Sequence, residues 1–241
     1  MMKKNGFTLA EVLITLAIIG VVATMTLPAL MTNTGEQQAK TGLKKGINTL
    51  TEAVTMNESV AGFGYDNITM DSPTAISGFT DDAADDQSLF GILANNCSID
   101  YSKDVNIAAI EGSGDVDNKF TVSVHLRDGS AILYDPATAK ANATNAKRQK
   151  DGLPLGFDVI LDTNGAKGPN VMSHCLDGGA LSTGADDRDE AAQFQKEKGA
   201  TYDISVCDTK QNRAIKDQFF VRLRGNTVQP SGKAAVWALE N

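Results

Sequence analysis

The sequence predicts an α+β fold in which a long N-terminal helix packs on an antiparallel β-sheet. Two observations predict it. The chain begins with an apolar segment that is followed by apolar residues at helical spacing, and its later part contains short alternating segments joined by tight turns. A helix covering one face of an antiparallel sheet is one of the few layered arrangements that bury the apolar sides of both elements.

Length and charge limit the functions that fit. The chain has 241 residues, with 22 Lys and Arg against 30 Asp and Glu, and a net charge of -8. This length suits one elaborated domain or a small domain with an appendage. Because nucleic-acid binding draws its affinity from phosphate neutralisation by Lys and Arg, the acidic balance argues against nucleic acid as a partner.

The N-terminal segment differs from everything after it. Between Phe7 and Leu30 the only charged residue is Glu11. A helix over this segment would be about 36 Å long, enough to cross a hydrocarbon core of roughly 30 Å. Lys3 and Lys4 precede it and would stay on the cytoplasmic side. We therefore predict one membrane-spanning helix followed by a soluble domain.

Three interpretations of this segment compete. A secretory signal fits poorly, because the apolar run is too long, contains Glu11 and offers only residues 21–23 as a weak cleavage site. A plain single-pass anchor fits the length but leaves Glu11 unexplained, since a carboxylate within a membrane costs several kcal/mol unless it is paired. A position at headgroup depth would be the simplest account of Glu11.

The third interpretation rests on a family resemblance. It is carried by the string Lys3-Lys4-Asn5-Gly6-Phe7-Thr8-Leu9-Ala10-Glu11. This string closely resembles the leader and processing site of type IV prepilins and type II secretion pseudopilins. The resemblance implies cleavage between Gly6 and Phe7, and N-methylation of Phe7, by a prepilin peptidase. It also implies that Glu11 neutralises the amino terminus of Phe7 in a neighbouring subunit, which gives the carboxylate a partner.

The resemblance also implies a function and a location. The chain would be a structural subunit of a type II secretion pseudopilus or a type IV pilus, assembled through its N-terminal helix, and not an enzyme. Its partners would be the prepilin peptidase, copies of itself or other (pseudo)pilins, an inner-membrane assembly platform and membrane lipid. The helix would cross the inner membrane once, with the head in the periplasm or outside the cell.

Two other functions stay open. One is a membrane-anchored periplasmic binding module that does not assemble. The other is a competence-type pilin that contacts DNA, for which the chain offers only one small basic loop cluster, within residues 140–150.

The implied pilin-like chain has four parts. They are a leader (1–6), a transmembrane and assembly helix (7–30), an amphipathic helix that continues into the head (31–62) and an α+β globular head (63–241). Four apolar residues lie on one face of the amphipathic helix by their spacing, namely Leu43, Ile47, Leu50 and Val54. Lys40 and Lys44 lie mostly outside that face.

Breaks in the helix and the elements of the head can also be predicted. Pro28 and Gly35 predict an interruption or loosening of the helix, and Gly62 with Gly64 predicts its end. Residues 119–126 and 131–134 alternate around the turn residues Asp128 and Gly129, which is typical of a hairpin. We further predict strands at 156–162, 202–206 and 218–223, helices at 89–93 and 187–198, and an acidic surface loop at 65–86.

One loop of the head could bind a metal ion. Asp162-Thr163-Asn164-Gly165 follows directly on a predicted strand and can present side-chain oxygens to a hard cation. Asp162 and Asn164 are the candidate ligands, with Asp158 or Asn170 as additions. Similar turns occur in the resembled family, whose major pseudopilins bind calcium, so Ca2+ is the cation considered. The alternative is an Asx-stabilised turn at a strand end, and the loop lacks the acidic twelfth position of an EF-hand.

The cysteines suggest a cross-link and no catalysis. Cys97, Cys175 and Cys207 lack metal-binding spacing. An odd number allows one disulfide in three pairings, and three reduced thiols are the alternative. If the head lies outside the cytoplasm, we favour Cys175 with Cys207. His174 stands beside Cys175, but neighbours in sequence point in different directions and do not make a nucleophile and its base.

Overall fold

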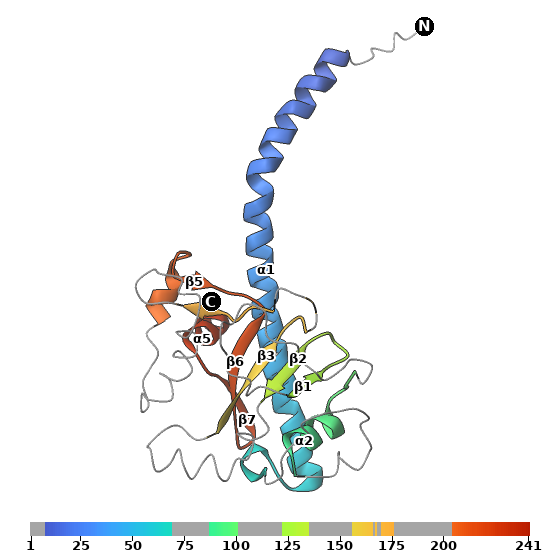
Figure 1. Ribbon diagram of the computed structural model, residues 1–241, viewed down its shortest axis with the longest axis vertical. Coiled ribbons are helices and arrows are strands. Elements are labelled where there is room, and N and C mark those ends of the chain that lie inside the picture. Colours follow the sequence, from blue (N-terminus) through green and yellow to red (C-terminus); the bar gives the residue numbers. More distant parts are fainter. Residues whose placement is uncertain are drawn as a thin grey trace. The chain divides into compact units, whose positions relative to one another are not determined.

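The computed structural model describes residues 8–68, 87–100, 122–134, 156–165, 167, 170–175 and 204–241. It confirms the predicted α+β class, with a long N-terminal helix and a five-stranded antiparallel sheet (Figure 1). The chain divides into two compact units, Met1–Gln38 and Ala39–Asn241.

Helix α1 runs from Leu9 to Ala61. The predicted interruption at Pro28 and Gly35 is wrong, because the helix is continuous through both positions. A proline removes one backbone hydrogen bond, and the turns before and after it keep theirs. The helix ends where predicted, at Gly62, whose φ of 78° is a conformation that glycine adopts without a steric penalty.

The main sheet has the strand order β1-β2-β3-β6-β7, and every neighbouring pair is antiparallel. Its strands are β1 (Val122–His125), β2 (Ala131–Tyr134), β3 (Phe157–Asp162), β6 (Gln218–Arg224) and β7 (Thr227–Pro230). The predicted hairpin is confirmed as β1 and β2. In its turn, Asp128 Oδ1 accepts a hydrogen bond from Ser130 N at 2.9 Å, and Gly129 has a φ of 94°.

Smaller elements surround this sheet. They are η1 (Tyr65–Asn67), α2 (Leu89–Asn96), η3 (Ile204–Asp208), α5 (Lys233–Glu240) and a separate two-stranded sheet of β4 (His174–Cys175) and β5 (Arg213–Ala214). The predicted acidic loop at 65–86 begins instead with η1, whose Tyr65 is fully buried and donates from its hydroxyl to Leu50 O at 2.8 Å. Residues 69–86 of that loop, and the helix predicted at 187–198, lie outside the described residues.

The C-terminal part of the chain differs most from the predicted elements. The strand predicted at 202–206 is wrong, since residues 204–208 form the 3-10 helix η3. Both edges of β6 are already paired, with β3 and β7, so no place beside that strand remains. The strand β7 and the helix α5 were not predicted.

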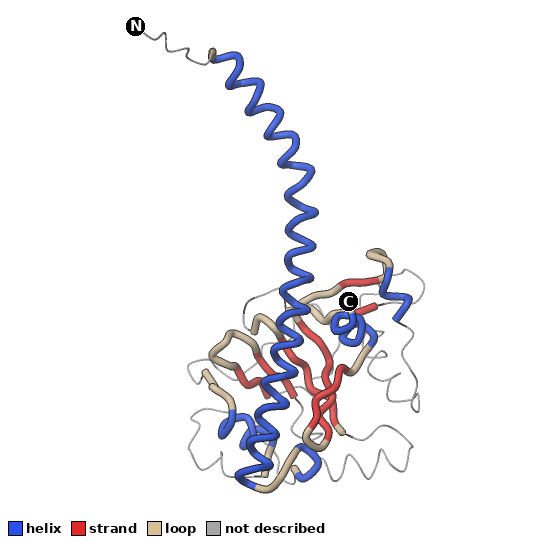
Figure 2. The backbone as a smooth tube through the Cα atoms, turned by 180° about the vertical axis from the view of Figure 1, so that it is seen from behind, coloured by secondary structure: helices blue, strands red, loops and turns tan. Residues whose placement is uncertain are grey.

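The second half of α1 lies across the sheet (Figure 2). Leu43, Leu50 and Val54 are fully buried, and Ile47 packs against the same core, which confirms the predicted apolar face. Two glycines allow the close approach. A β-carbon at Gly42 would lie 2.6 Å from Thr163 Cβ, and one at Gly46 would overlap Leu161. The helix therefore packs directly on the end of β3.

Candidate functional site

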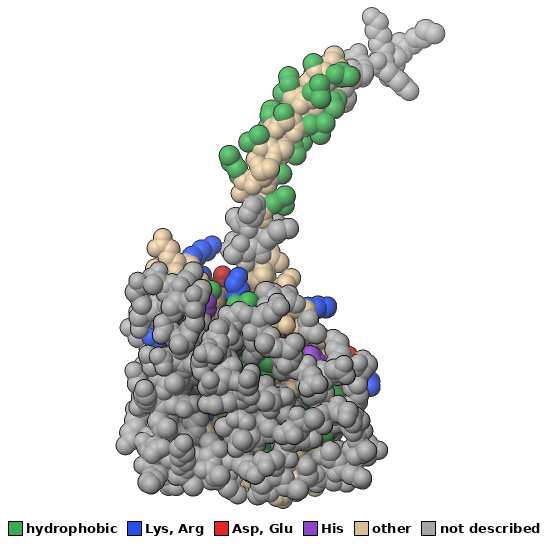
Figure 3. Space-filling view, viewed as in Figure 1, with side chains coloured by type: hydrophobic (Ala, Val, Ile, Leu, Met, Phe, Trp, Pro, Cys, Tyr) green, Lys and Arg blue, Asp and Glu red, His purple; other side chains and the backbone are tan. Residues whose placement is uncertain are grey.

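The N-terminal part of α1 is an apolar helix that the described chain does not cover. Leu9–Leu27 is a 19-residue candidate membrane span with a mean hydropathy of 2.2, and none of it is buried. Leu9 is 78% exposed and Met25 76%, and Figure 3 shows apolar side chains projecting from the surface along this helix. Because a contiguous apolar surface of this size is unfavourable in water, it fits a lipid environment or contact with other helices.

The threonine side chains within this span are hydrogen-bonded to the helix's own backbone. The threonine hydroxyls donate to backbone carbonyls of the preceding turn, at 2.8–3.1 Å: Thr15 to Val12, Thr24 to Val21 and Thr26 to Val22. A hydroxyl bonded in this way exposes no unpaired donor, so these residues are compatible with an apolar surrounding.

Glu11 forms a capping box with Thr8 at the start of α1. Glu11 Oε2 accepts hydrogen bonds from Thr8 N and Thr8 Oγ1, both at 2.8 Å. In return, Glu11 N donates to Thr8 Oγ1 at 3.3 Å. The two side chains satisfy backbone donors that the first turn of a helix otherwise leaves unpaired. A negative charge at this end also interacts favourably with the helix dipole.

This arrangement adds Thr8 to the site. Sequence analysis assigned it no role, although Thr-x-x-Glu before an apolar run is the sequence signature of a capping box. Glu11 Oε1 receives no hydrogen bond from any residue that the structure describes. The carboxylate therefore keeps an oxygen available to a further donor. The predicted cleavage residues, Gly6 and Phe7, lie outside the described residues.

The Asp162 loop is a turn closed by its own side chains. Asp162 Oδ1 accepts from Asn164 N at 3.0 Å and from Gly165 N at 2.7 Å, which is the pattern of an Asx turn. Asp162 Oδ2 accepts from Gln218 Nε2 at 2.8 Å. Both carboxylate oxygens are therefore engaged with nitrogen donors.

Asp217 closes the same loop from another part of the chain. Its Oδ1 accepts from Val171 N at 2.9 Å, and its Oδ2 accepts from Asn170 N at 2.7 Å and from Asn164 Nδ2 at 2.9 Å. Asp217 is 5% exposed. Sequence analysis did not find it, because it is 53 residues from Asn164 and belongs to no recognisable motif.

The buried position of Asp162 changes its acidity. Burial raises the pKa of Asp162 to about 6, and the nearby Asp217 carboxylate adds to the increase. Hydrogen bonds from Gln218 and from the N–H groups of Asn164 and Gly165 act in the opposite direction. Burial dominates because it disfavours the charged form of a carboxyl group.

These contacts bear on the metal-site prediction. Asp158, one proposed addition, pairs instead with Arg222 at 2.9 Å, and the Asn170 amide faces two backbone carbonyls of the loop, to which its nitrogen donates once the amide oxygen and nitrogen are exchanged. Within the described part of the chain, no group of three or more His, Cys, Asp or Glu side chains could hold a metal ion. A cation would have to displace the present donors. Ca2+ binding by Asp162 and Asn164 stays a prediction.

Cys175 and Cys207 form a disulfide, with their Cα atoms 5.2 Å apart. This is the pairing that sequence analysis favoured. Cys97 is a free thiol, and burial raises its pKa to about 11. The cross-link joins β4 to η3, and both of its residues are buried.

Comparison with known proteins bears on the N-terminus. Residues 1–27 match the family model described as the prokaryotic N-terminal methylation motif. No curated protein and no solved structure gives a significant match to the chain. The chain thus carries a prepilin-type motif, which includes Glu11 and the first part of the apolar helix.

Proposed function

We propose that the chain is a structural subunit of a type IV pilus or a type II secretion pseudopilus, cleaved between Gly6 and Phe7 and assembled through α1. The observation that carries this proposal is the prepilin-type motif together with an apolar span that no described residue of the chain covers. Lipid would cover this apolar surface before assembly, and the helices of other subunits would cover it afterwards. One helix would then serve as membrane anchor and as filament core.

The geometry at Glu11 supports its role as the docking residue. Cleavage would free the Phe7 nitrogen as a charged amino group, which stays charged after the separate N-methylation step, two residues before α1 begins. Glu11 Oε2 accepts from Thr8, whereas Oε1 accepts from no residue in the described part of the chain and could accept from an ammonium group of a neighbouring subunit. Because an unpaired charge in an apolar bundle is costly, assembly would favour the register that brings the two groups together.

The remaining parts would follow from this anchor. Residues 1–6 would be the leader, 7–30 the assembly helix, 31–62 its continuation and 63–241 the head, in the periplasm or outside the cell. The partners would be the prepilin peptidase, an inner-membrane assembly platform, lipid and other (pseudo)pilins. Under this proposal the protein is a structural subunit and not an enzyme, as its motif suggests.

Mass spectrometry of the N-terminus tests the proposal. The protein is purified from membranes of its native host, beside a Gly6→Val variant expressed in the same way. We expect the parent chain to begin at N-methylated Phe7 and the variant to keep its leader. A parent chain that retains Gly6 in cells with an active prepilin peptidase would contradict the proposal and favour a membrane-anchored module that does not assemble.

A further inference from the structure

The C-terminal helix α5 depends on its surroundings for stability. It has eight residues, and helices this short are not stable on their own in water. It buries one face, made of Ala234, Ala235, Trp237 and Ala238. This face packs against η3, β4 and β6. Since η3 and β4 carry the two bonded cysteines, α5 rests on both sides of the disulfide.

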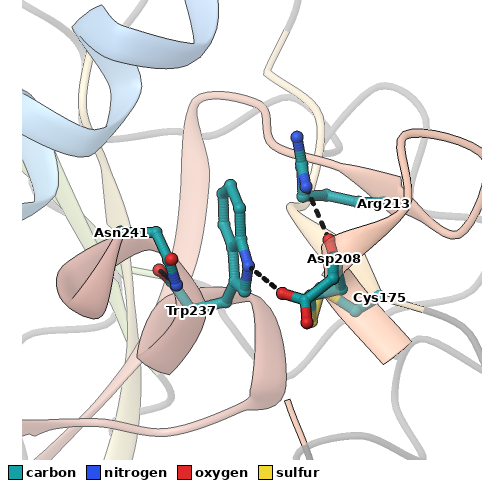
Figure 4. Close-up of a disulfide and its surroundings, with 6 residues drawn as sticks. Cys175, Asp208, Arg213, Trp237 and Asn241 are labelled. Carbon is teal, nitrogen blue, oxygen red and sulfur yellow. Dashed lines mark hydrogen bonds between the residues drawn. A yellow bond between two sulfur atoms is a disulfide. The ribbon is translucent and has the colours of Figure 1, made fainter. Parts of the chain in front are cut away.

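Trp237 is the central side chain of this packing (Figure 4). Its Nε1 donates to Asp208 Oδ1 at 3.2 Å, and Asp208 directly follows Cys207. The indole ring also contacts two cations. Lys40 Nζ lies 4.0 Å from the ring centroid and Arg213 Cζ lies 3.9 Å from it. The ring therefore connects α5 to α1 and to residues beside the disulfide, through cation–π contacts as well as a hydrogen bond.

Arg213 connects the ring to both bonded cysteines. Its NH1 group donates to Cys207 O at 2.6 Å. In the small sheet, Arg213 is paired with Cys175. Arg213 thus contacts both residues that the disulfide joins, Cys207 through its guanidinium and Cys175 through the pairing of their strands. Any separation of Cys175 from Cys207 must disturb the position of Arg213.

The elements on which α5 packs would be unstable without the disulfide. β4 and β5 have two residues each and η3 has five, so few backbone hydrogen bonds hold them together. The disulfide joins residues 32 positions apart and restricts the chain between them. The disulfide is itself buried, with Cys175 1% and Cys207 0% exposed. A thiolate can attack it only after a local opening.

We propose that the Cys175–Cys207 disulfide and α5 form a redox latch, in which the disulfide holds the surface on which α5 docks and α5 keeps the disulfide covered. An external dithiol would transfer two electrons and two protons to the disulfide, giving two cysteine thiols and an oxidised dithiol. In the reduced chain α5 leaves its site, and Trp237 loses its contacts with Lys40, Asp208 and Arg213. The five-stranded sheet stays folded, because α1 and the ladders between its own strands hold it.

Fluorescence of Trp237 tests the first half of the latch. It is the only tryptophan of the chain, so its emission reports directly on α5. The full chain in detergent micelles is compared before and after reduction with dithiothreitol. We expect acrylamide quenching to increase about twofold or more while amide exchange in β3 and β6 stays slow. Unchanged quenching overturns the proposal, and so does loss of amide protection throughout the sheet.

The rate of reduction tests the second half. Coupling between two sites is reciprocal, so weakening α5 docking must expose the disulfide. We expect Trp237→Ala to be reduced on the order of tenfold faster than the parent chain. Glu240→Ala is the control, since this residue is exposed on the same helix. A variant reduced at the parent rate, or a control reduced as fast as Trp237→Ala, contradicts the latch.

A milder variant covers the case in which Trp237→Ala fails to fold. Lys40→Met keeps most of the side-chain length and removes the charge that lies over the ring. We expect a smaller acceleration of reduction, on the order of two- to threefold. If Lys40→Met is reduced at the same rate as the parent chain, the proposed coupling between α5 and the disulfide is wrong. Cys97→Ser is introduced into every chain, so that only the disulfide thiols react.

Discussion

Gly46 of α1 lies so close to Leu161 of β3 that a β-carbon at position 46 would overlap the leucine side chain. The contact fixes the distance between the helix and the middle strand of the sheet. Leu161 is itself fully buried, so it has little room to move away. Gly46 is therefore a packing residue, in spite of its low helix propensity.

Gly46→Ala should destabilise the head. Overpacking of a buried contact typically costs about 1–3 kcal/mol, which exceeds the gain of about 1 kcal/mol in helix propensity. Gly35→Ala is the matched control, because nothing lies within 4 Å of its β-carbon position. Urea unfolding of the full chains in micelles, followed by Trp237 fluorescence, measures both. Equal stability of the two variants would contradict the packing role.

Glu11 can be tested separately as a cap and as a charge. Glu11→Gln keeps an oxygen that can accept from Thr8 but removes the charge. We expect normal membrane insertion and a loss of filament incorporation on the order of tenfold, because the neutral side chain cannot pair with an ammonium group. The measurement is the ratio of subunit in the filament and membrane fractions. Undiminished incorporation of Glu11→Gln would refute the docking role.

Sequence reasoning succeeded where a pattern is local. The spacing of Leu43, Leu50 and Val54 predicted the buried face of α1, and the turn at Asp128 predicted the β1-β2 hairpin. Lys40 shows why such reasoning fails elsewhere. Its position outside the apolar stripe predicted a lysine away from the core, yet it is 7% exposed and its Nζ lies over the ring of Trp237, which is distant in the sequence.

The candidate sites follow the same rule. Glu11 stands in a contiguous motif, and the Asx turn of Asp162 is encoded within four residues, so the sequence indicated both, the turn as the alternative to a metal site. The contact of Asn164 with Asp217 depends on the pairing of β3 with β6, which the spacing of residues does not encode. The sequence therefore indicated the turn but not the second carboxylate that closes it.

The raised pKa of Asp162 should make the head less stable as pH increases. The value is about 6 in the fold and 3.8 without it, so the folded state binds a proton that the unfolded chain has released. This stabilisation, up to about 3 kcal/mol, is complete below the lower value and is lost as pH rises through about 6.

Asp162→Asn isolates this effect. The amide keeps an oxygen for the N–H groups of Asn164 and Gly165, and the Gln218 amide can rotate to accept from its nitrogen. We expect the difference in unfolding free energy between variant and parent to change between pH 4 and pH 6 and to be constant above pH 7. Urea titrations of both chains at each pH measure it. A difference independent of pH would show that Asp162 does not titrate in this range.

The ion pair between Asp158 and Arg222 links β3 to β6 inside the head. Arg222 donates from Nε and NH2 to the two carboxylate oxygens, both at 2.9 Å, and Ser231 Oγ donates to Asp158 Oδ1 at 2.8 Å. The side chains are only 2% and 8% exposed. Removing one partner leaves the other charge buried without its counter-ion, and this costs more than the pair itself contributes.

A double-mutant cycle tests this asymmetry. We expect Arg222→Met to destabilise the head by about 3–5 kcal/mol, because the Asp158 carboxylate then loses its paired guanidinium while it stays in a low-dielectric surrounding. Adding Asp158→Asn should restore part of that loss, since the remaining group is neutral. Thermal or urea unfolding of the four chains gives the coupling energy. Losses that simply add would mean that the two charges do not depend on each other and that the ion pair does not couple β3 to β6.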